Sequence, residues 1–167
     1  MTVRPFVRED IGPLKAILEA TGVFRPEEIE VAVELMEIVV EEPEQQDYLM
    51  YTGVDDTGHV QGYYCVGPTP MTERTYDLYW IAVSPAAQGK GDSKELLDHC
   101  IELVRSRGGA KIIAETSSQQ SYDRTRAFYK KHGFVEEARI RDYYSAGDDL
   151  VVYTRTIQDK REARSEK

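Results

Sequence analysis

Apolar residues recur three or four positions apart near the start of the chain, which is the pattern of amphipathic helices. One such helix is predicted from Asp10 to about Thr21, where Gly22 ends the pattern. A second begins at Pro26, because proline followed by acidic residues suits a first helical turn, and it stops near Pro43. The apolar positions behind these two predictions are Leu14, Ile17, Leu18, Ile29, Val33, Met36 and Val40.

From Tyr48 onward the apolar residues follow the spacing of strands. Residues 48–54 and 60–66 flank Asp55-Asp56-Thr57-Gly58, which is a hairpin turn signal. The order β-α-α-β-β-β-α-β-α-β-β predicts a mixed sheet with helix crossovers, which is an α+β (mixed α/β) domain. The remaining predicted elements are strands at 3–7, 76–83, 111–116, 134–140 and 150–157 and helices at 92–107 and 123–132, with residues 141–148 joining the last two strands.

The length of 167 residues, with 41% hydrophobic and 31% charged residues, fits one soluble globular domain. We expect this domain to cover residues 1–157 and the charged tail, 158–167, to fray. No apolar run approaches the ~20 residues of a membrane span, and the first residues do not form a secretory leader. These features predict a cytoplasmic protein without a membrane partner.

The formal net charge of −9 argues against a nucleic-acid partner, because binding to phosphates needs a basic patch. An acidic balance suits a cationic partner, and it equally suits solubility alone. Cys65 and Cys100 lie far apart in no metal-ligand spacing, which is typical of small buried hydrophobic residues in a reducing compartment. We therefore expect no metal site, and the sequence leaves a homodimer open.

Candidate chemistry lies at the stretch SPAAQGKGDSKELL, residues 84–97, which leads from a strand into a helix. Gln88-Gly89-Lys90-Gly91 places backbone N–H groups at a helix start, where an anion such as phosphate binds well. The pattern lacks the ending of a P-loop and the third glycine of a dinucleotide fingerprint. Taken alone, the stretch is therefore as consistent with a structural turn as with a phosphate site.

The same stretch, together with a second motif, resembles the GNAT family of N-acetyltransferases. In that family a strand ending in V-x-P is followed by Q/R-G-x-G-x-G/A and a leucine-rich helix, as in IAVSPAAQGKGDSKELL here. The family's aromatic-tyrosine pair and following Gly-Phe match Phe128-Tyr129 and Gly133-Phe134. The resemblance covers nearly the whole chain and implies a central mixed, twisted sheet with helices on both faces, splayed between strands 4 and 5.

The resemblance also implies acetyl-CoA as co-substrate and a set of residues that hold it. The pyrophosphate would bind the backbone N–H groups of residues 88–93, and the pantetheine would pair with the main chain of Ile81 and Val83. Two positions depart from the family pattern, namely Asp92 and Ser93. The full set implied to hold the cofactor is Ile81, Ala82, Val83, Gln88, Gly89, Lys90, Gly91, Asp92, Ser93, Tyr122 and Thr125.

Acetyl transfer to an amine needs a base, a stabilised oxyanion and a proton for the departing thiolate. By resemblance, Tyr129 is the general acid and a backbone N–H around residues 81–83 meets the oxyanion. Glu115 is the candidate base, with Asp77 and Tyr79 as rivals, and its alternative is a strand-end carboxylate bonded to nearby hydroxyls. Residues that could contact the acceptor are Trp80, Tyr79 and Tyr143, and Tyr144, Asp148 and Asp149 of the last hairpin join them as candidates.

The sequence thus predicts an N-acetyltransferase that acts by direct attack in a ternary complex, without a cysteine acyl-enzyme. A small-molecule primary amine is the expected acceptor, and an amine-bearing peptide is the second choice. The rival interpretation is a degenerate regulatory module of the same fold that binds CoA or a partner without catalysis. Asp92 is its main support, because a carboxylate at the phosphate site repels pyrophosphate, whereas at a helix start it can also cap N–H groups.

Overall fold

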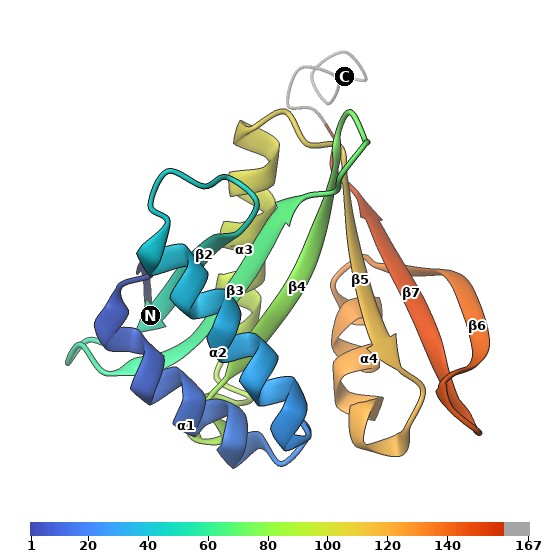
Figure 1. Ribbon diagram of the computed structural model, residues 1–167, viewed down its shortest axis with the longest axis horizontal. Helices are drawn as coiled ribbons and strands as arrows, with labels where there is room; N and C mark the ends of the chain where they lie inside the picture. Colours follow the sequence, from blue (N-terminus) through green and yellow to red (C-terminus); the bar gives the residue numbers. More distant parts are fainter. Residues whose placement is uncertain (159–167) are drawn as a thin grey trace. The chain divides into compact units, whose positions relative to one another are not determined.

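The computed structural model describes residues 1–158, which form seven strands and four α-helices (Figure 1). Short 3-10 turns at Arg8–Asp10, Pro85–Ala87 and Gln120–Tyr122 precede α1, α3 and α4. In chain order the elements are β1 (Thr2–Pro5), α1 (Ile11–Thr21), α2 (Pro26–Glu41), β2 (Leu49–Val54), β3 (Val60–Pro68), β4 (Thr75–Val83), α3 (Asp92–Ser106), β5 (Lys111–Ser117), α4 (Asp123–Lys131), β6 (Val135–Ser145) and β7 (Asp148–Thr156).

The strands are hydrogen-bonded in the order β1-β2-β3-β4-β5-β7-β6, which is the mixed sheet that the sequence predicts. β4 and β5 pair in parallel, whereas β1 with β2, β2 with β3, β5 with β7 and β6 with β7 are antiparallel. The described parallel pairs run only from Thr75 opposite Lys111 to Asp77 opposite Ile113. This short run agrees with the expected splay between the fourth and fifth strands.

The chain divides into two compact units, and two elements pass from one to the other. The first unit comprises Met1–Pro68 and Tyr79–Cys100, and the second comprises Thr69–Leu78 and the chain from Ile101 onward. β4 therefore begins in the second unit and ends in the first, and α3 begins in the first and ends in the second.

The core of the first unit lies between its strands and the pair α1 and α2, which cover one face (Figure 1). The helices form where predicted because their apolar positions fall on one stripe that can be buried. Gly22 ends α1 in the left-handed region, with φ of 67°, a conformation that glycine adopts without steric cost. The buried residues of the two helices are Leu14, Ile17, Leu18, Ile29, Ala32 and Met36, and Val33 and Val40 are partly buried against them.

A buried carboxylate ties the start of the chain to the sheet of the first unit. Asp10, only 2% exposed, accepts hydrogen bonds from both terminal nitrogens of Arg4 at 2.7 and 2.8 Å and from the Thr52 hydroxyl at 2.8 Å. The N–H of Val7 donates to the same carboxylate. Burial alone would raise the pKa of Asp10, but the bonds from Arg4, Val7 and Thr52 outweigh it and lower that pKa.

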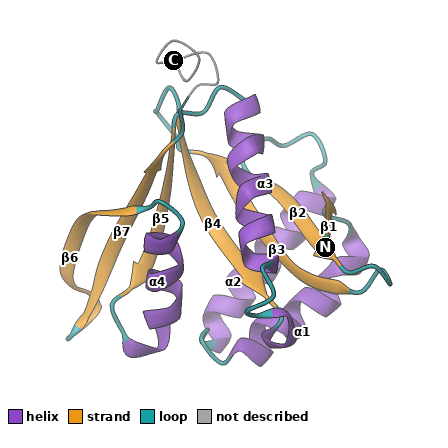
Figure 2. Cartoon of the chain, turned by 180° about the vertical axis from the view of Figure 1, so that it is seen from behind, coloured by secondary structure: helices purple, strands orange, loops and turns teal. Residues whose placement is uncertain are grey.

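The other face of the first unit carries the first half of α3 (Figure 2). Tyr64 on β3 and His99 on α3 are joined by a hydrogen bond of 2.7 Å between the tyrosine hydroxyl and Nδ1. Tyr51 stacks on Tyr64 with ring centroids 5.6 Å apart. These aromatic contacts fix the position of α3 above β2 and β3.

In the second unit, β5 and β7 pair over the whole of β5, and α4 packs on one face of them (Figure 2). Tyr129 of α4 lies against Phe134 and against Tyr153 of β7, with ring centroids 5.1 and 5.8 Å apart. Gly109 must be glycine because a Cβ there would fall 2.3 Å from the Val104 side chain and 2.9 Å from the Tyr76 ring. Tyr129, Phe134 and Tyr153 are thus buried together on the face that α4 covers.

The structure corrects the predicted connection between the last two strands. Residues 141–148 were expected to join strands ending at Ile140 and starting at Leu150, yet β6 runs to Ser145 and β7 begins at Asp148. The pairing shifts between Ile140 and Ser145, because Asp142 lies in the left-handed region with φ of 53°. This is an irregular edge strand with a bulge, which no alternation of apolar residues reveals.

Three further expectations concern the tail, the membrane and the cysteines. Residues 159–167 of the predicted tail lie outside the described residues. No helix among the described residues combines the length and apolar character that crossing a bilayer requires. Cys65 and Cys100 are both buried free thiols.

The Asp10 network generates a stability prediction. Replacing Asp10→Asn removes the charge that Arg4 contacts, and we expect the free energy of unfolding to fall by about 2 to 4 kcal/mol. Because the folded pKa of Asp10 is lowered, its contribution is present above the unfolded pKa and is lost as pH falls through the folded value. Urea unfolding of wild type and variant across pH measures both effects.

Asp98→Asn is the matched control, because the exposed Asp98 forms only a surface ion pair with Lys94. We expect it to change the unfolding free energy by less than about 0.5 kcal/mol. Equal losses of unfolding free energy in the two variants would mean that the buried network stabilises the fold no more than a surface ion pair does.

Two neighbouring tyrosines of β3 generate a second prediction. The Tyr63 hydroxyl is buried without a hydrogen-bond partner among the described residues, whereas the Tyr64 hydroxyl is bonded to His99. Tyr63→Phe should therefore raise the unfolding free energy by about 1 kcal/mol, and Tyr64→Phe should lower it by about 1 kcal/mol. Thermal unfolding of wild type and both variants measures these changes. A clear loss of stability in Tyr63→Phe would show that the Tyr63 hydroxyl has a hydrogen-bond partner in solution.

Candidate functional site

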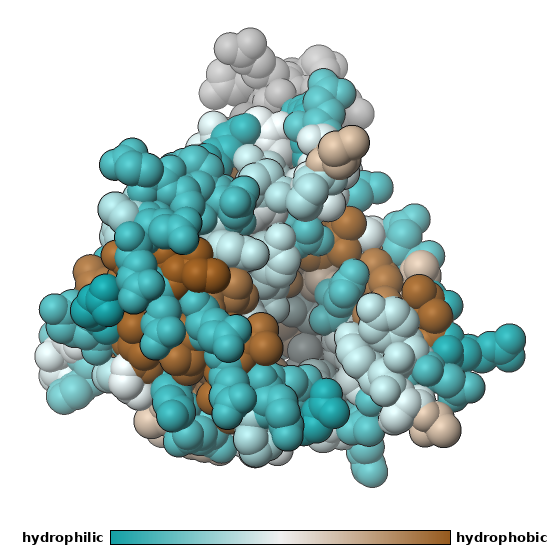
Figure 3. Space-filling view, in the orientation of Figure 1, coloured by the Kyte–Doolittle hydropathy of each residue, from teal (hydrophilic) through white to brown (hydrophobic). Residues whose placement is uncertain are grey.

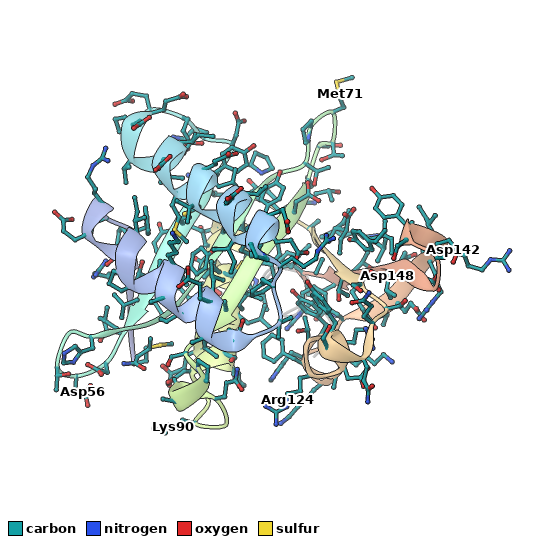
Figure 4. All side chains as sticks on the ribbon, turned by 60° about the horizontal axis from the view of Figure 1, so that its bottom comes forward. Asp56, Met71, Lys90, Arg124, Asp142 and Asp148 are labelled. Carbon is teal, nitrogen blue, oxygen red and sulfur yellow. The ribbon has the colours of Figure 1, made fainter. Side chains whose placement is uncertain are left out.

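The turn before α3 is open on its outer side. Gly89 and Gly91 have φ of 79° and 93°, a left-handed conformation that side chains with a Cβ rarely adopt. A Cβ on either glycine would meet no atom within 4 Å, so the glycines are needed for backbone conformation and not for packing. Figure 4 shows Lys90 in this turn at the surface of the first unit, and Gln88 is exposed as well.

Backbone N–H groups gather at this turn. The N–H groups of Gln88 and Lys90 donate within the turn, to Pro85 and Ala87, and that of Glu95 donates to Gly91. Within residues 1–158, no bond is described for the N–H groups of Gly89, Gly91, Asp92 and Ser93. The first N–H groups of a helix lack partners inside it, and together with the helix dipole they favour an anion.

Asp92 is the first residue of α3 and is partly exposed. Its carboxylate complements the positive end of the helix dipole. In the described part of the chain it makes no hydrogen bond or ion pair, so the capping role weighed from the sequence is not seen. A negative charge therefore lies at the first residue of the helix, next to the glycine turn.

The end of β4 leads into this turn and packs tightly against β3. A Cβ on Gly62 would fall 2.4 Å from the Ala82 carbonyl oxygen, and the N–H of Ser84 donates to the Gln61 carbonyl at 2.7 Å. Ala82 and Val83 are buried and Ile81 is partly buried. This strand end is therefore held firmly from the β3 side.

Two aromatic residues of β4 have aromatic neighbours within the first unit. Trp80 meets Phe24 edge-on with ring centroids 5.1 Å apart, and Tyr79 meets Tyr48 edge-on at 5.5 Å. Tyr79 is 39% exposed and Trp80 is partly buried. Acceptor contact by either residue stays a prediction.

Glu115 and Asp77 are two carboxyl groups of the second unit that interact with each other. Glu115 lies on β5, two residues beyond Ile113, which is in register with Asp77 of β4. Burial, and next the nearby carboxylate of Asp77, raise the pKa of Glu115. The hydroxyl of Thr69 donates to Asp77 at 2.8 Å and so fixes the second carboxylate. A carboxyl group with a raised pKa is suited to take and release protons.

Tyr129 is only 5% exposed and lies on the α4 side of the sheet. Its neighbour across the rings, Tyr153, is paired in register with Ala114. Because successive strand residues point to opposite faces, Glu115 projects from the face that α4 does not cover. The structure thus brings Glu115 and Asp77 together, and it places the Tyr129 ring on the other face.

The end of β5 contains a buried polar pair that sequence reasoning missed. The Ser117 hydroxyl donates to Asp148 at 2.5 Å, and both side chains are buried. Asp148, weighed from the sequence as part of an acceptor pocket, is thus occupied in a structural contact. No local pattern signals this pair, because its members are far apart in sequence and meet only through the β5–β7 register.

The bulge of β6 is held by a second network at the hairpin end, where Figure 4 labels Asp142 and Asp148. Asp149 accepts from the Asp142 N–H at 3.0 Å and from Arg139 at 3.2 Å, and Asp142 accepts from the Gly147 N–H at 2.7 Å. The bond from the Asp142 N–H, and then Arg139, lower the pKa of Asp149. Tyr143 projects from this bulge, 55% exposed and edge-on to Tyr144.

The implied cofactor residues fall in both units. Ile81, Val83 and the turn of residues 88–93 are in the first, whereas Tyr122 and Thr125, both partly buried, lie at the start of α4 in the second. No cluster of three or more potential metal-binding side chains occurs within residues 1–158.

Comparison with known proteins places this fold. A structure from Desulfovibrio desulfuricans assigned to the GNAT family is 39% identical, with a TM-score of 0.86 over 94% of this chain and 99% of that chain. An aminoglycoside 6'-N-acetyltransferase complexed with coenzyme A shares the fold, with 18% identity and a TM-score of 0.76 over 96% of this chain and 99% of that one. A mycothiol acetyltransferase from Beutenbergia cavernae is 30% identical over 69 residues, which are 41% of this chain and 23% of that protein. The chain thus spans about a quarter of the length of this curated relative.

The profile of the Acetyltransferase (GNAT) family matches residues 17–134, which include the turn before α3, Glu115 and Tyr129. The glycine turn, the parallel pairing of β4 and β5 and the strand order agree with this match. The chain belongs to the GNAT family of acetyltransferases.

Proposed function

We infer that this protein is an acetyl-CoA-dependent N-acetyltransferase that acetylates the primary amine of a small molecule. The observation that carries the inference is the open turn before α3, where no bond is described for the N–H groups of Gly89, Gly91, Asp92 and Ser93, in a GNAT-family chain. One structural relative is complexed with coenzyme A, which supports the same ligand here. Two free cysteines are compatible with a reducing cytoplasm.

The turn would hold the pyrophosphate through its backbone. The N–H groups of Gly89, Gly91, Asp92 and Ser93 would donate to phosphate oxygens, and the open space outside the glycines lets the group approach the backbone. Lys90 would add a positive charge at the rim. Main-chain groups of Ile81 and Val83 would pair with the pantetheine arm, with Tyr122 and Thr125 as further contacts.

Bound acetyl-CoA would supply a thioester carbonyl carbon, to which the amine nitrogen bonds as the carbon–sulfur bond breaks. A protonated amine must first lose a proton, and Glu115 would accept it because its raised pKa brings it nearer to working pH. Tyr129 would donate a proton toward the departing sulfur from the α4 side of the sheet, the side opposite to that of Glu115. A backbone N–H at the end of β4, among Ile81, Ala82 and Val83, would stabilise the developing oxyanion.

Direct attack by the amine is favoured over a cysteine acyl-enzyme. Burial raises the pKa of Cys65 to about 12, and burial followed by the nearby Cys65 also raises the pKa of Cys100. Both thiols therefore stay protonated at neutral pH and are poor nucleophiles. Two-substrate kinetics with intersecting lines are expected.

Cofactor binding gives the first test of this proposal. Acetyl-CoA at about 100 times its Kd should raise the Tm by roughly 5 to 10 °C. Asp92→Asn should tighten acetyl-CoA binding about five- to tenfold, because it removes a negative charge from the turn where the phosphates would bind, and the gain should shrink at high salt. Calorimetric titration of wild type and variant measures both constants.

Gly91→Ala and Gly58→Ala form a matched pair for the same experiment. Both glycines have positive φ and open space where a Cβ would lie, but Gly58 belongs to the β2–β3 turn. Both variants should lose stability through strain, whereas only Gly91→Ala should weaken acetyl-CoA, by about tenfold. No binding by wild type, with binding by Asp92→Asn, would instead favour the degenerate module.

The base generates a prediction on rate and pH. Glu115→Gln should lower kcat by about 100- to 10,000-fold. In wild type, kcat should fall as pH drops through the raised pKa of Glu115, because the protonated carboxyl cannot accept a proton. Asp77→Asn should move this acid limb to lower pH, since it removes one cause of the raised pKa.

Tyr129→Phe separates the acid from the base in the same pH profiles. It should lower kcat and leave the acid limb where it is in wild type. An Asp77→Asn profile that coincides with that of wild type would exclude Glu115 as the titrating base.

A further inference from the structure

The face of the second unit that α4 leaves uncovered carries one continuous row of side chains. Glu115 of β5 is paired with Val152 of β7, which in turn is paired with Ala138 of β6. Directly paired residues of antiparallel strands point to the same face. The three side chains therefore lie side by side across the sheet, with Glu115 at one end and Ala138 at the other.

Strand spacing fixes the reach of this row. Neighbouring strands lie about 4.8 Å apart, so Ala138 is about 10 Å from Glu115 across β7. Ile140, paired with Leu150, adds the next side chain along β6 on the same face. A ligand with its amine at Glu115 would thus extend over Val152 to Ala138 and Ile140.

This apolar strip, defined as Val152, Ala138 and Ile140, is open to solvent. Ile140 is 51% exposed, Ala138 is exposed and Val152 is partly exposed. Among the described residues eight large hydrophobic side chains are exposed, and four of them, Val135, Ile140, Tyr143 and Tyr144, belong to β6. Figure 3 shows hydrophobic residues at the surface over β7 and β6. Half of these exposed side chains thus lie on β6, which β7 separates from the strand of Glu115.

Charged side chains bordering the strip are already engaged. Glu137, at the bulge of β6, accepts a hydrogen bond from Thr154 at 2.7 Å. Arg139 is paired with Val151 and therefore points to the opposite face, where it contacts Glu136 at 2.9 Å and Asp149 at 3.2 Å. Glu137 thus places a second carboxylate beside the strip, next to Thr154, whereas Val152, Ala138 and Ile140 themselves offer apolar contact.

We propose that the acceptor is a primary amine attached to an apolar or aromatic body, whose body lies on the strip while its amine meets Glu115. The proposal rests on the proposed function and names its substrate class. A cationic amine complements the carboxylate pair, and burying an apolar group on exposed valine, alanine and isoleucine is favourable.

Phenethylamine and ethanolamine test the proposal, because they differ in a phenyl group against a hydroxyl on the same two-carbon amine. We expect the kcat/KM of wild type to be at least about tenfold higher for phenethylamine. Ala138→Asp places a carboxylate in the middle of the strip at an exposed position, so folding is preserved. It should reduce the preference to about threefold or less, mainly through a higher KM for phenethylamine.

Val31→Asp is the matched control, since it introduces the same charge at an apolar position of α2 that is 50% exposed. It should keep the full preference. Calorimetric titration of phenethylamine into the CoA-saturated protein should show binding that weakens about tenfold in Ala138→Asp but not in Val31→Asp.

The outcomes separate this inference from the proposed function. If both amines are acetylated with equal or opposite preference, the strip does not bind the acceptor, whereas the proposed acetyltransferase activity is supported. Phenethylamine binding that depends on Ala138, with no acetylation of either amine, would keep the strip and overturn the proposed function. Equal effects of Ala138→Asp and Val31→Asp would show only a general effect of charge and overturn the strip.

Discussion

The antiparallel register between β5 and β7 is the constraint on which the second unit depends. It pairs every residue of β5 with a residue of β7, from Lys111 opposite Thr156 to Ser117 opposite Leu150. Because side chains alternate between faces, a slip of one residue would turn Glu115 into the core and Ala114 out of it. The same register sets Tyr153 against Tyr129 and brings Ser117 to Asp148. The chemistry of one face and the packing of the other are therefore fixed together.

The carboxylates of this acidic chain serve different ends according to what surrounds them. Asp10 is buried, receives a guanidinium and two further donors, and holds the start of the chain to β2. Asp148 is buried and accepts a hydrogen bond from the Ser117 hydroxyl at the end of β5. Glu115 shares its surroundings with another carboxylate, and its pKa is raised instead of lowered. Structural carboxylates here have donors pointed at them, whereas the candidate base has a neighbour of its own charge.

The turn before α3 combines attraction and repulsion at one position. Its unpaired N–H groups and the helix dipole favour an anion, and Asp92 at the first residue of the helix opposes one. In the empty protein that carboxylate offsets the positive end of the helix, so it stabilises the state without ligand. The same side chain thus stabilises the empty turn and weakens the attraction of the turn for an anion.

The sequence by itself determined the order of the elements, the buried stripes of α1 and α2 and the glycine turn at residues 88–91. These follow from local rules, because helix period, strand alternation and positive-φ glycines act over a few residues. It also pointed to Glu115 and Asp77 as candidates, since the residue types and the predicted strands that carry them can be read from the sequence.

Only the tertiary structure decided which of these groups meet. The coupling of Glu115 to Asp77, the Ser117–Asp148 pair and the row from Glu115 to Ala138 depend on strand order and register between segments distant in the chain. The bulge at Asp142 escaped prediction because it is held by Asp149 and Gly147 and not by the pattern of β6 itself. Local sequence carries periodicity, whereas contacts between distant segments arise from the free energy of the whole packed chain.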